Sequence, residues 1–187
     1  MKRPLIFGAL LCALGMMVGC SSYMMTTLVG CEYDEKKDVT DYYVYPLGQV
    51  YIPGKWEKCG YNRVARQQFF INPDGVIISV SFPRPERFEW NRDGALRGFD
   101  FIKAYYEWER DYFDSLGFEC SVIEKDIEKR YLIHRFCRGS GSEKEYDTYF
   151  LVRMKGDDQY SVFSIAHPVK WSDEETVLFL KKLFLSE

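Results

Sequence analysis

The sequence predicts an α+β fold, in which an antiparallel sheet packs against one long central helix and a C-terminal helix. Three observations predict it. Apolar residues recur every three or four positions over 101–116, which is typical of an amphipathic helix. Segments on both sides of this helix alternate apolar and polar residues with a period of two, as half-buried strands do. A second helical pattern after Ser172 closes the chain. This order of elements is that of an α+β domain.

The first residues have the pattern of a secretory signal. Lys2 and Arg3 precede an apolar run over residues 5–18, which is followed by Gly19 and Cys20. A basic start and a short apolar core are typical of a cleaved signal peptide, and the core is too short for an ordinary membrane-spanning helix. We therefore assign residues 1–19 to a signal peptide.

Val18, Gly19 and Cys20 resemble the lipobox of bacterial lipoproteins, in which the cysteine is lipidated, for example with palmitate, and becomes the mature N-terminus. Met17 departs from the leucine that is usual there, and residues 28–31 match the four-residue pattern better. That second site, however, would extend the apolar core through polar residues. We therefore expect lipidation at Cys20, with a plain cleaved signal or an uncleaved anchor as the alternative. The resemblance implies a membrane-anchored protein of the bacterial cell envelope that faces the periplasm or the cell exterior.

The mature chain divides into a tether and one domain. Residues 20–41 are polar or mixed with no periodicity, so we expect a lipidated N-terminus followed by a tether. Residues 42–187 form a single α+β domain. Prolines and glycines divide 42–56 into short extended pieces. The chain has a net charge of −3 and no basic block, which argues against binding to nucleic acid.

The clearest hairpin signal lies at residues 72–75, where Asn-Pro-Asp-Gly separates the predicted strands 67–71 and 76–82. Proline presets the first turn position, and glycine accepts the positive φ that follows. Pro83 and Pro85 end the second strand, and residues 84–98 are expected to form a surface excursion.

The central helix carries an aromatic stripe that we expect to face the core: Phe101, Tyr105, Trp108, Tyr112 and Leu116. Beyond Gly117, the alternating segments 120–123, 131–137, 146–154 and 160–166 predict an antiparallel meander. Ser172 and Glu175 have the spacing of a capping box and predict the start of the C-terminal helix.

Outside the leader the chain has cysteines at positions 31, 59, 120 and 137, an even number in a compartment that favours disulfides. Of the three possible pairings we expect Cys31–Cys59 and Cys120–Cys137, because each joins neighbours in the sequence. A metal site at His134 and Cys137 is the alternative. It is incomplete, because zinc prefers four ligands and the only other histidine is His167. We therefore expect no metal and no cofactor.

The order of elements resembles the PsbP-like fold, the family of an extrinsic photosystem subunit and several envelope lipoproteins. The resemblance rests on residues 52–56, the hairpin around 72–75, the helix 101–116 and the final strand and helix over 160–185. Members of this family are mainly binding or assembly modules, so the resemblance implies interaction rather than catalysis.

No nucleophile motif of the Gly-x-Ser-x-Gly or His-Glu-x-x-His type is present, so we expect no enzymatic activity. We expect instead a membrane-anchored envelope lipoprotein that binds a protein partner or assists assembly. Tyrosine and tryptophan suit interfaces, so the candidate interface is Tyr42, Tyr43, Tyr45, Tyr51, Trp56 and Tyr61. The competing interpretation is that these residues cover an edge of the core. The alternative functions are a periplasmic immunity or inhibitor lipoprotein, and a small-ligand carrier with a pocket between sheet and helix.

Overall fold

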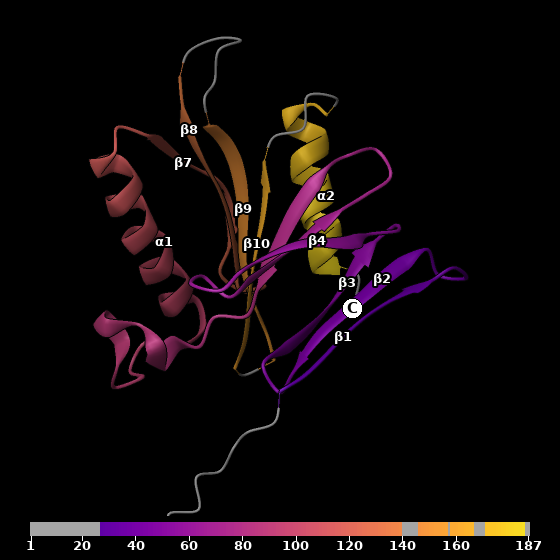
Figure 1. The fold of residues 1–187 in the computed structure, drawn as a ribbon. Helices are drawn as coiled ribbons and strands as arrows, with labels where there is room; N and C mark the ends of the chain where they lie inside the picture. The colour runs from indigo at the N-terminus through magenta and orange to yellow at the C-terminus, as the bar shows by residue number, and fades with distance from the viewer. Residues whose placement is uncertain (1–26, 140–145, 157, 167–170, 186–187) are drawn as a thin grey trace, which may run out of the picture.

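The computed structural model describes residues 27–139, 146–156, 158–166 and 171–185. They form two antiparallel sheets, two α-helices and two short 3-10 helices, Pro85–Arg87 and Glu89–Asn91 (Figure 1). A three-stranded sheet has the order β1-β2-β3, with β1 over Leu28–Asp34, β2 over Val39–Tyr45 and β3 over Gly48–Pro53. The α-helices are α1 (Gly98–Ser115) and α2 (Asp173–Leu185).

The larger sheet has seven strands in the order β4-β5-β6-β10-β9-β8-β7. Their bounds are β4 Glu57–Asn62, β5 Gln67–Ile71, β6 Ile77–Ser81, β7 Glu119–Asp126, β8 Tyr131–Arg138, β9 Tyr146–Lys155 and β10 Gln159–Ala166. The predicted meander is confirmed, because β7 to β10 pair in sequence order. The predicted hairpin is confirmed as β5 and β6, with Gly75 at a φ of 82° in its turn.

The small sheet corrects two expectations, a single sheet and a tether over residues 20–41. β1 begins at Leu28 and pairs with β2 along its whole length. The turn between them is held by Asp34, whose side chain accepts hydrogen bonds from the backbone N–H groups of Lys36 and Lys37. No side chain of β1 is fully buried, so the strand lacks the apolar alternation by which a sequence reveals one.

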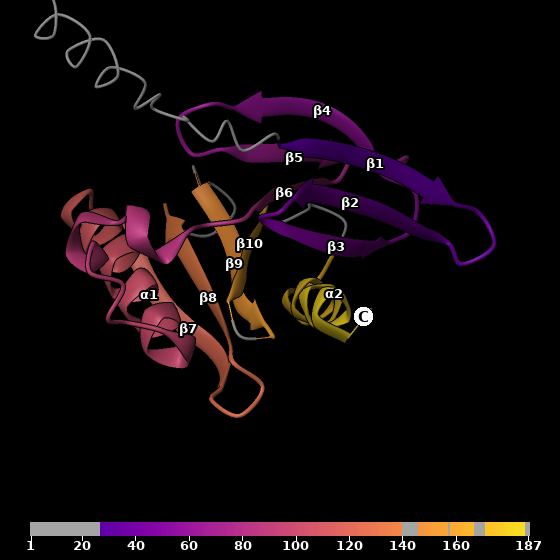
Figure 2. The same cartoon turned by 90° about the horizontal axis from the view of Figure 1, so that it is seen from below.

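The two faces of the large sheet are covered differently (Figure 2). On one face α1 packs against β7, β8 and β9, while α2 and the small sheet cover the other. The core therefore has two parts, one on each side of the sheet. Alternate residues of β9 contribute to each part, as Phe150 and Val152 face α1 whereas Tyr149 and Leu151 face α2. Neither of the two described α-helices has the length and apolar character needed to cross a membrane.

The predicted face of α1 is partly wrong. Phe101 and Tyr105 are buried, but Trp108, Tyr112 and Leu116 keep exposed fractions of 48%, 61% and 47%. The face against the sheet is completed by Ile102 and Tyr106. A helix turns by 100° per residue, so two overlapping stripes compete for the sheet. The buried one includes Glu109, which interrupts the apolar pattern.

No disulfide joins the cysteines of the described residues, contrary to the expected pairs Cys31–Cys59 and Cys120–Cys137. The register gives the reason for the second pair. Cys120 lies opposite Phe136 and packs with it on the α1 face, so Cys137, the next residue along β8, points to the opposite face. For the first pair, Cys31 packs against the core beneath the small sheet, whereas Cys59 is exposed at a bulge in β4.

Candidate functional site

A groove runs beside α1 over the part of the large sheet that this helix leaves uncovered. Its volume is about 450 Å³. Strands β5, β6, β10 and β9 form the floor, and α1 forms one wall with Tyr105, Glu109 and Phe113. Figure 2 shows the cause, since α1 lies against one end of the sheet while β4 and β5 lie at the other.

The floor of the groove carries a chain of hydrogen bonds across three neighbouring strands. Gln67 Nε2 donates to Ser79 Oγ at 2.6 Å, and Ser79 Oγ lies 2.5 Å from Ser164 Oγ. Ser79 and Ser164 are direct partners in the antiparallel register, so their side chains meet on one face. These polar groups are flanked by apolar side chains that also line the groove: Phe69, Ile77, Tyr146, Phe150 and Val162.

Among the described residues that line the groove, Glu109 on the α1 wall is the one that carries a carboxylate. Its Oε1 accepts a hydrogen bond from the Tyr105 hydroxyl at 3.0 Å. Its Oε2 is buried, makes no hydrogen bond within the described part of the chain, and lies 3.5 Å from His134 Nε2. The side chain keeps an exposed fraction of 14%. A carboxylate at the mouth of a mostly apolar groove is unusual, because burying a charge is costly without compensating partners.

Behind Glu109 lies His134, fully buried on β8 between Leu132 and Phe136 of the same face. Its ring is parallel to the ring of Phe150, and the two ring centroids are 5.0 Å apart. The centroid of the His134 ring also lies 4.9 Å from the centroid of the Tyr106 ring. Neither ring nitrogen makes a hydrogen bond among the described residues. Buried polar atoms without partners are rare in folded proteins and call for an explanation.

The electrostatics of this wall are simple. Burial and the neighbouring Glu109 carboxylate raise the pKa of Tyr105 well above its ordinary value of 10.0, so its hydroxyl stays neutral and continues to donate to Glu109. No lysine or arginine occurs among the residues described as lining the groove. A groove with apolar walls and a few convergent polar groups is the usual form of a small-molecule site.

The structure separates the residues of the predicted interface. Tyr42 and Trp56 are core residues with exposed fractions of 3% and 4%, so the prediction that they form an interface is wrong. Tyr42 packs on Phe70 and Phe82, and burial raises its pKa to about 12. For Tyr42 the physical reason is alternation, since the even-numbered residues of β2 face the large sheet.

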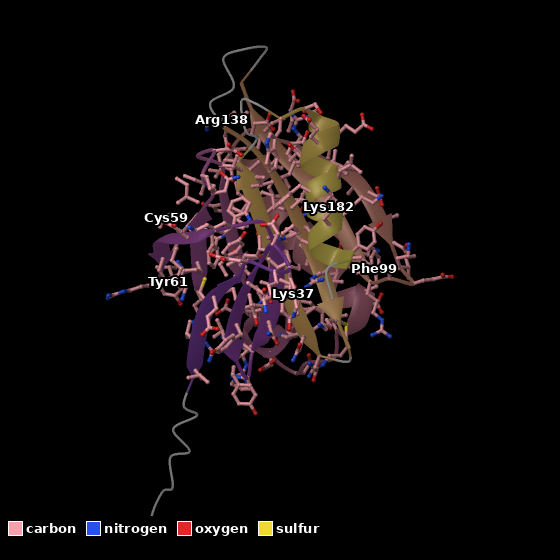
Figure 3. All side chains as sticks on the ribbon, turned by 90° about the vertical axis from the view of Figure 1, so that its right-hand side faces the viewer. Lys37, Cys59, Tyr61, Phe99, Arg138 and Lys182 are labelled. Atoms are coloured by element: carbon pink, nitrogen blue, oxygen red, sulfur yellow. The ribbon has the colours of Figure 1, made fainter. Side chains whose placement is uncertain are left out.

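The other interface candidates remain at the surface, on two different sheets. Tyr43, Tyr45 and Tyr51 share the outer face of the small sheet, and Tyr45 keeps an exposed fraction of 67%. The ring of Tyr43 lies over Gly30, where a Cβ atom would come within 2.1 Å of it. Tyr61 is 55% exposed on β4, and Figure 3 shows it close to Cys59, on the side of the molecule away from Lys182 of α2.

Several predicted residues lie outside the described part of the chain. These are the lipidation candidate Cys20 and the second histidine, His167. Among the described residues no group of three or more histidine, cysteine and acidic side chains is placed to hold a metal ion. Cys137 lies near Glu119 instead, with 3.8 Å between its Sγ and Oε2.

Sequence reasoning missed Glu109 and the polar floor of the groove. A signal for Glu109 exists, because positions 102, 105, 106, 109 and 113 share one helix face. The same holds for His134, which alternates with Leu132 and Phe136 on a predicted strand. No sequence signal places α1 over this part of the sheet, which is what brings the two side chains together.

Comparisons with known proteins give little further information. No protein-family model matches the chain, and no curated protein resembles it. Among solved structures, the chain is similar to the solution structure of cyanobacterial PsbP (CyanoP) from Synechocystis sp. PCC 6803. The two share 13% sequence identity with a TM-score of 0.45, over 90% of this chain and 96% of the other. A likeness at this level says nothing about function.

Proposed function

We propose that this protein is a lipid-anchored, non-enzymatic binding protein of the bacterial cell envelope, whose domain holds a small molecule in the groove beside α1. The observation that carries the proposal is the groove itself, whose lining combines a partly buried carboxylate, a hydrogen-bonded polar chain on the floor and apolar side chains. Both the volume of about 450 Å³ and the mixed lining fit a small-molecule site.

The anchor in this proposal is Cys20. The placement of the apolar core after Lys2 and Arg3 supports it, and so does the position of β1. Cleavage before Cys31 would remove Leu28, Val29 and Gly30 from β1, including the glycine on which the Tyr43 ring rests. Cleavage before Cys20 leaves the small sheet whole.

The groove can be tested with the full-length protein, extracted in detergent from membranes of an expressing bacterium. The probe is N-phenyl-1-naphthylamine, an uncharged apolar dye that fluoresces when it leaves water. Its signal is read against the same detergent without protein, because the dye also enters micelles. We expect binding to the wild-type protein and a loss of at least tenfold in affinity for Ala166→Trp. Ala166 is an exposed residue at the end of β10 that lines the groove, so a large ring there fills the space.

Ile127→Trp is the matched control, because Ile127 is 63% exposed in the turn between β7 and β8 and does not line the groove. It adds the same ring to the surface and should leave affinity unchanged. Equal binding by the wild-type protein and Ala166→Trp would place the dye elsewhere and reject the groove as the site.

A second candidate function is protein binding through the outer face of the small sheet. The observation that favours it is the set of tyrosines gathered there beside acidic side chains. Gln49 Nε2 donates to Asp41 Oδ1 at 2.8 Å and to the Tyr51 hydroxyl at 3.1 Å, which orders this surface. Aromatic residues on a preordered face are frequent energetic centres of interfaces. An immunity or inhibitor lipoprotein would use such a face.

A further inference from the structure

We infer that the ligand of the groove is a small organic cation, an ammonium group joined to an apolar or aromatic body. This inference rests on the proposed function and adds the chemical class of the ligand. It follows from the charge of the lining, the aromatic side chains beside that charge, and the polar floor opposite.

The charge of the groove is that of Glu109. Its carboxylate has one hydrogen bond, from the neutral hydroxyl of Tyr105, and none from a lysine or arginine among the described lining residues. The nearest basic group is His134, whose Nε2 lies 3.5 Å from Oε2 without forming a hydrogen bond. Oε2 is buried on the His134 side, so a ligand would meet the rest of the Glu109 carboxylate. An anion entering this groove would meet a group of like charge, whereas a cation would meet one of opposite charge.

Four aromatic side chains line the groove together with Glu109. Tyr105 and Phe113 lie one helical turn before and after Glu109 on α1, and Tyr146 and Phe150 belong to β9. The negative faces of such rings attract cations within about 6 Å of the ring centroid. A carboxylate combined with aromatic rings favours an ammonium group over a metal ion, which would need several oxygen ligands.

The rest of the groove fits an uncharged body. Phe69, Ile77 and Val162 provide apolar surface, while the Gln67, Ser79 and Ser164 chain offers hydrogen bonds at its centre. A ligand with its ammonium group at Glu109 would extend away from α1 across β10 and β6. The sheet order places β10 next to β9 and β6 next to β10. Neighbouring strands lie about 4.8 Å apart, so the distance suits one or two rings.

The test uses three probes of similar shape: 2-(1-naphthyl)ethylamine, 2-(1-naphthyl)ethanol and 1-naphthylacetate, at neutral pH where the amine is charged. Affinities are measured by displacement of N-phenyl-1-naphthylamine from the detergent-extracted protein. We expect the amine to bind at least tenfold more tightly than the alcohol, because a hydrogen bond between charged groups contributes about a tenfold gain in affinity or more. The negatively charged acetate should bind more weakly than both, because Glu109 repels it.

In Glu109→Gln, the amine and the alcohol should bind with equal affinity, and the affinity for the alcohol should match that of the wild-type protein. Glu107→Gln is the control, since Glu107 lies on the same helix, does not line the groove, has a side chain that is 45% exposed, and forms an ion pair with exposed Lys103. It removes the same charge and should change neither affinity.

The outcomes separate the two proposals. If the dye does not bind the wild-type protein, the proposed function fails. If the dye binds but the alcohol displaces it as well as the amine, the groove stands and the cation is rejected. The wild-type ratio alone decides this, even if Glu109→Gln does not fold. Loss of alcohol binding in a folded Glu109→Gln variant would also reject the inference. The role of Glu109 would then be to maintain the shape of the groove, and not to recognise the charge of the ligand.

Discussion

Tyr45 and Trp56 lie in one aromatic stretch of the sequence but have opposite roles in the structure. Trp56 is held from two sides, as its backbone N–H donates to Thr40 Oγ1 at 2.9 Å and its indole Nε1 to the Pro53 carbonyl at 2.8 Å. Its ring contacts Phe179 of α2. Tyr45 ends β2 with most of its side chain in solvent.

The pair provides a test of the protein-binding candidate. Trp56→Ala should destabilise the fold by about 3 to 5 kcal/mol, as truncation of a buried tryptophan does. Tyr45→Ala should change stability by less than about 0.5 kcal/mol and should weaken capture of an envelope partner if the outer face of the small sheet binds one. Thermal melts measure the first effect, and pull-downs from detergent-solubilised envelopes measure the second. Partner capture that survives Tyr45→Ala unchanged would argue against an interface at this residue.

At the scale of elements, a buried arginine joins α2 to the large sheet. Arg153 of β9 is only 2% exposed. Its Nε donates to Ser161 Oγ at 2.9 Å, and its Nη1 donates to the carbonyl oxygens of Leu183 at 3.0 Å and Phe184 at 3.3 Å. The last carbonyls of a helix have no partners within the helix, and a cation there also favours the helix dipole. Arg153 therefore caps the end of α2.

We expect Arg153→Met to lower the free energy of unfolding by about 3 kcal/mol, because buried carbonyls and Ser161 lose a charged donor. The end of α2 should also lose protection from hydrogen exchange. Arg92→Met is the control, since Arg92 is exposed and pairs with exposed Glu89, and it should change stability by less than about 0.5 kcal/mol. Urea unfolding measures both. A loss below 1 kcal/mol for Arg153→Met would show that the cap contributes little.

At the scale of the whole molecule, the two faces of the large sheet have different roles. One face is closed by α2 and the small sheet. The other is closed over β7, β8 and β9 by α1, which leaves the groove over β5, β6 and β10. One sheet therefore provides both a closed core and an open groove. The groove lies beside α1, over the strands that this helix does not cover.

The anchor gives the prediction at this scale. Metabolic labelling with an alkyne analogue of palmitate should mark the full chain and its Cys31→Ser variant, but not Cys20→Ser. The lipid would hold the protein stably at a membrane, because each buried methylene of an acyl chain contributes about 0.8 kcal/mol. Label retained in Cys20→Ser and lost in Cys31→Ser would move the mature start into β1 and contradict the assignment.

The sequence by itself determined the elements that depend on local patterns. The hairpin between β5 and β6 follows from Pro73 and Gly75, the meander from alternation along β8 to β10, and α2 from its capping box. Ser172 and Glu175 form that box in the structure, with the Ser172 N–H donating to Glu175 Oε2 at 2.7 Å and the Glu175 N–H to Ser172 Oγ at 3.1 Å. These signals are local because the backbone conformation that they require is local.

Only the tertiary structure decided which face of α1 is buried, that residues 28–34 form a strand, and that Glu109 meets His134. β1 is stabilised by hydrogen bonds to β2, a contribution that its own side chains do not reveal. The face of α1 depends on the sheet beneath it, and the α1 sequence offers two overlapping apolar stripes. The groove, finally, exists because a helix covers part of a wide sheet, and that position is set by packing between segments far apart in the chain.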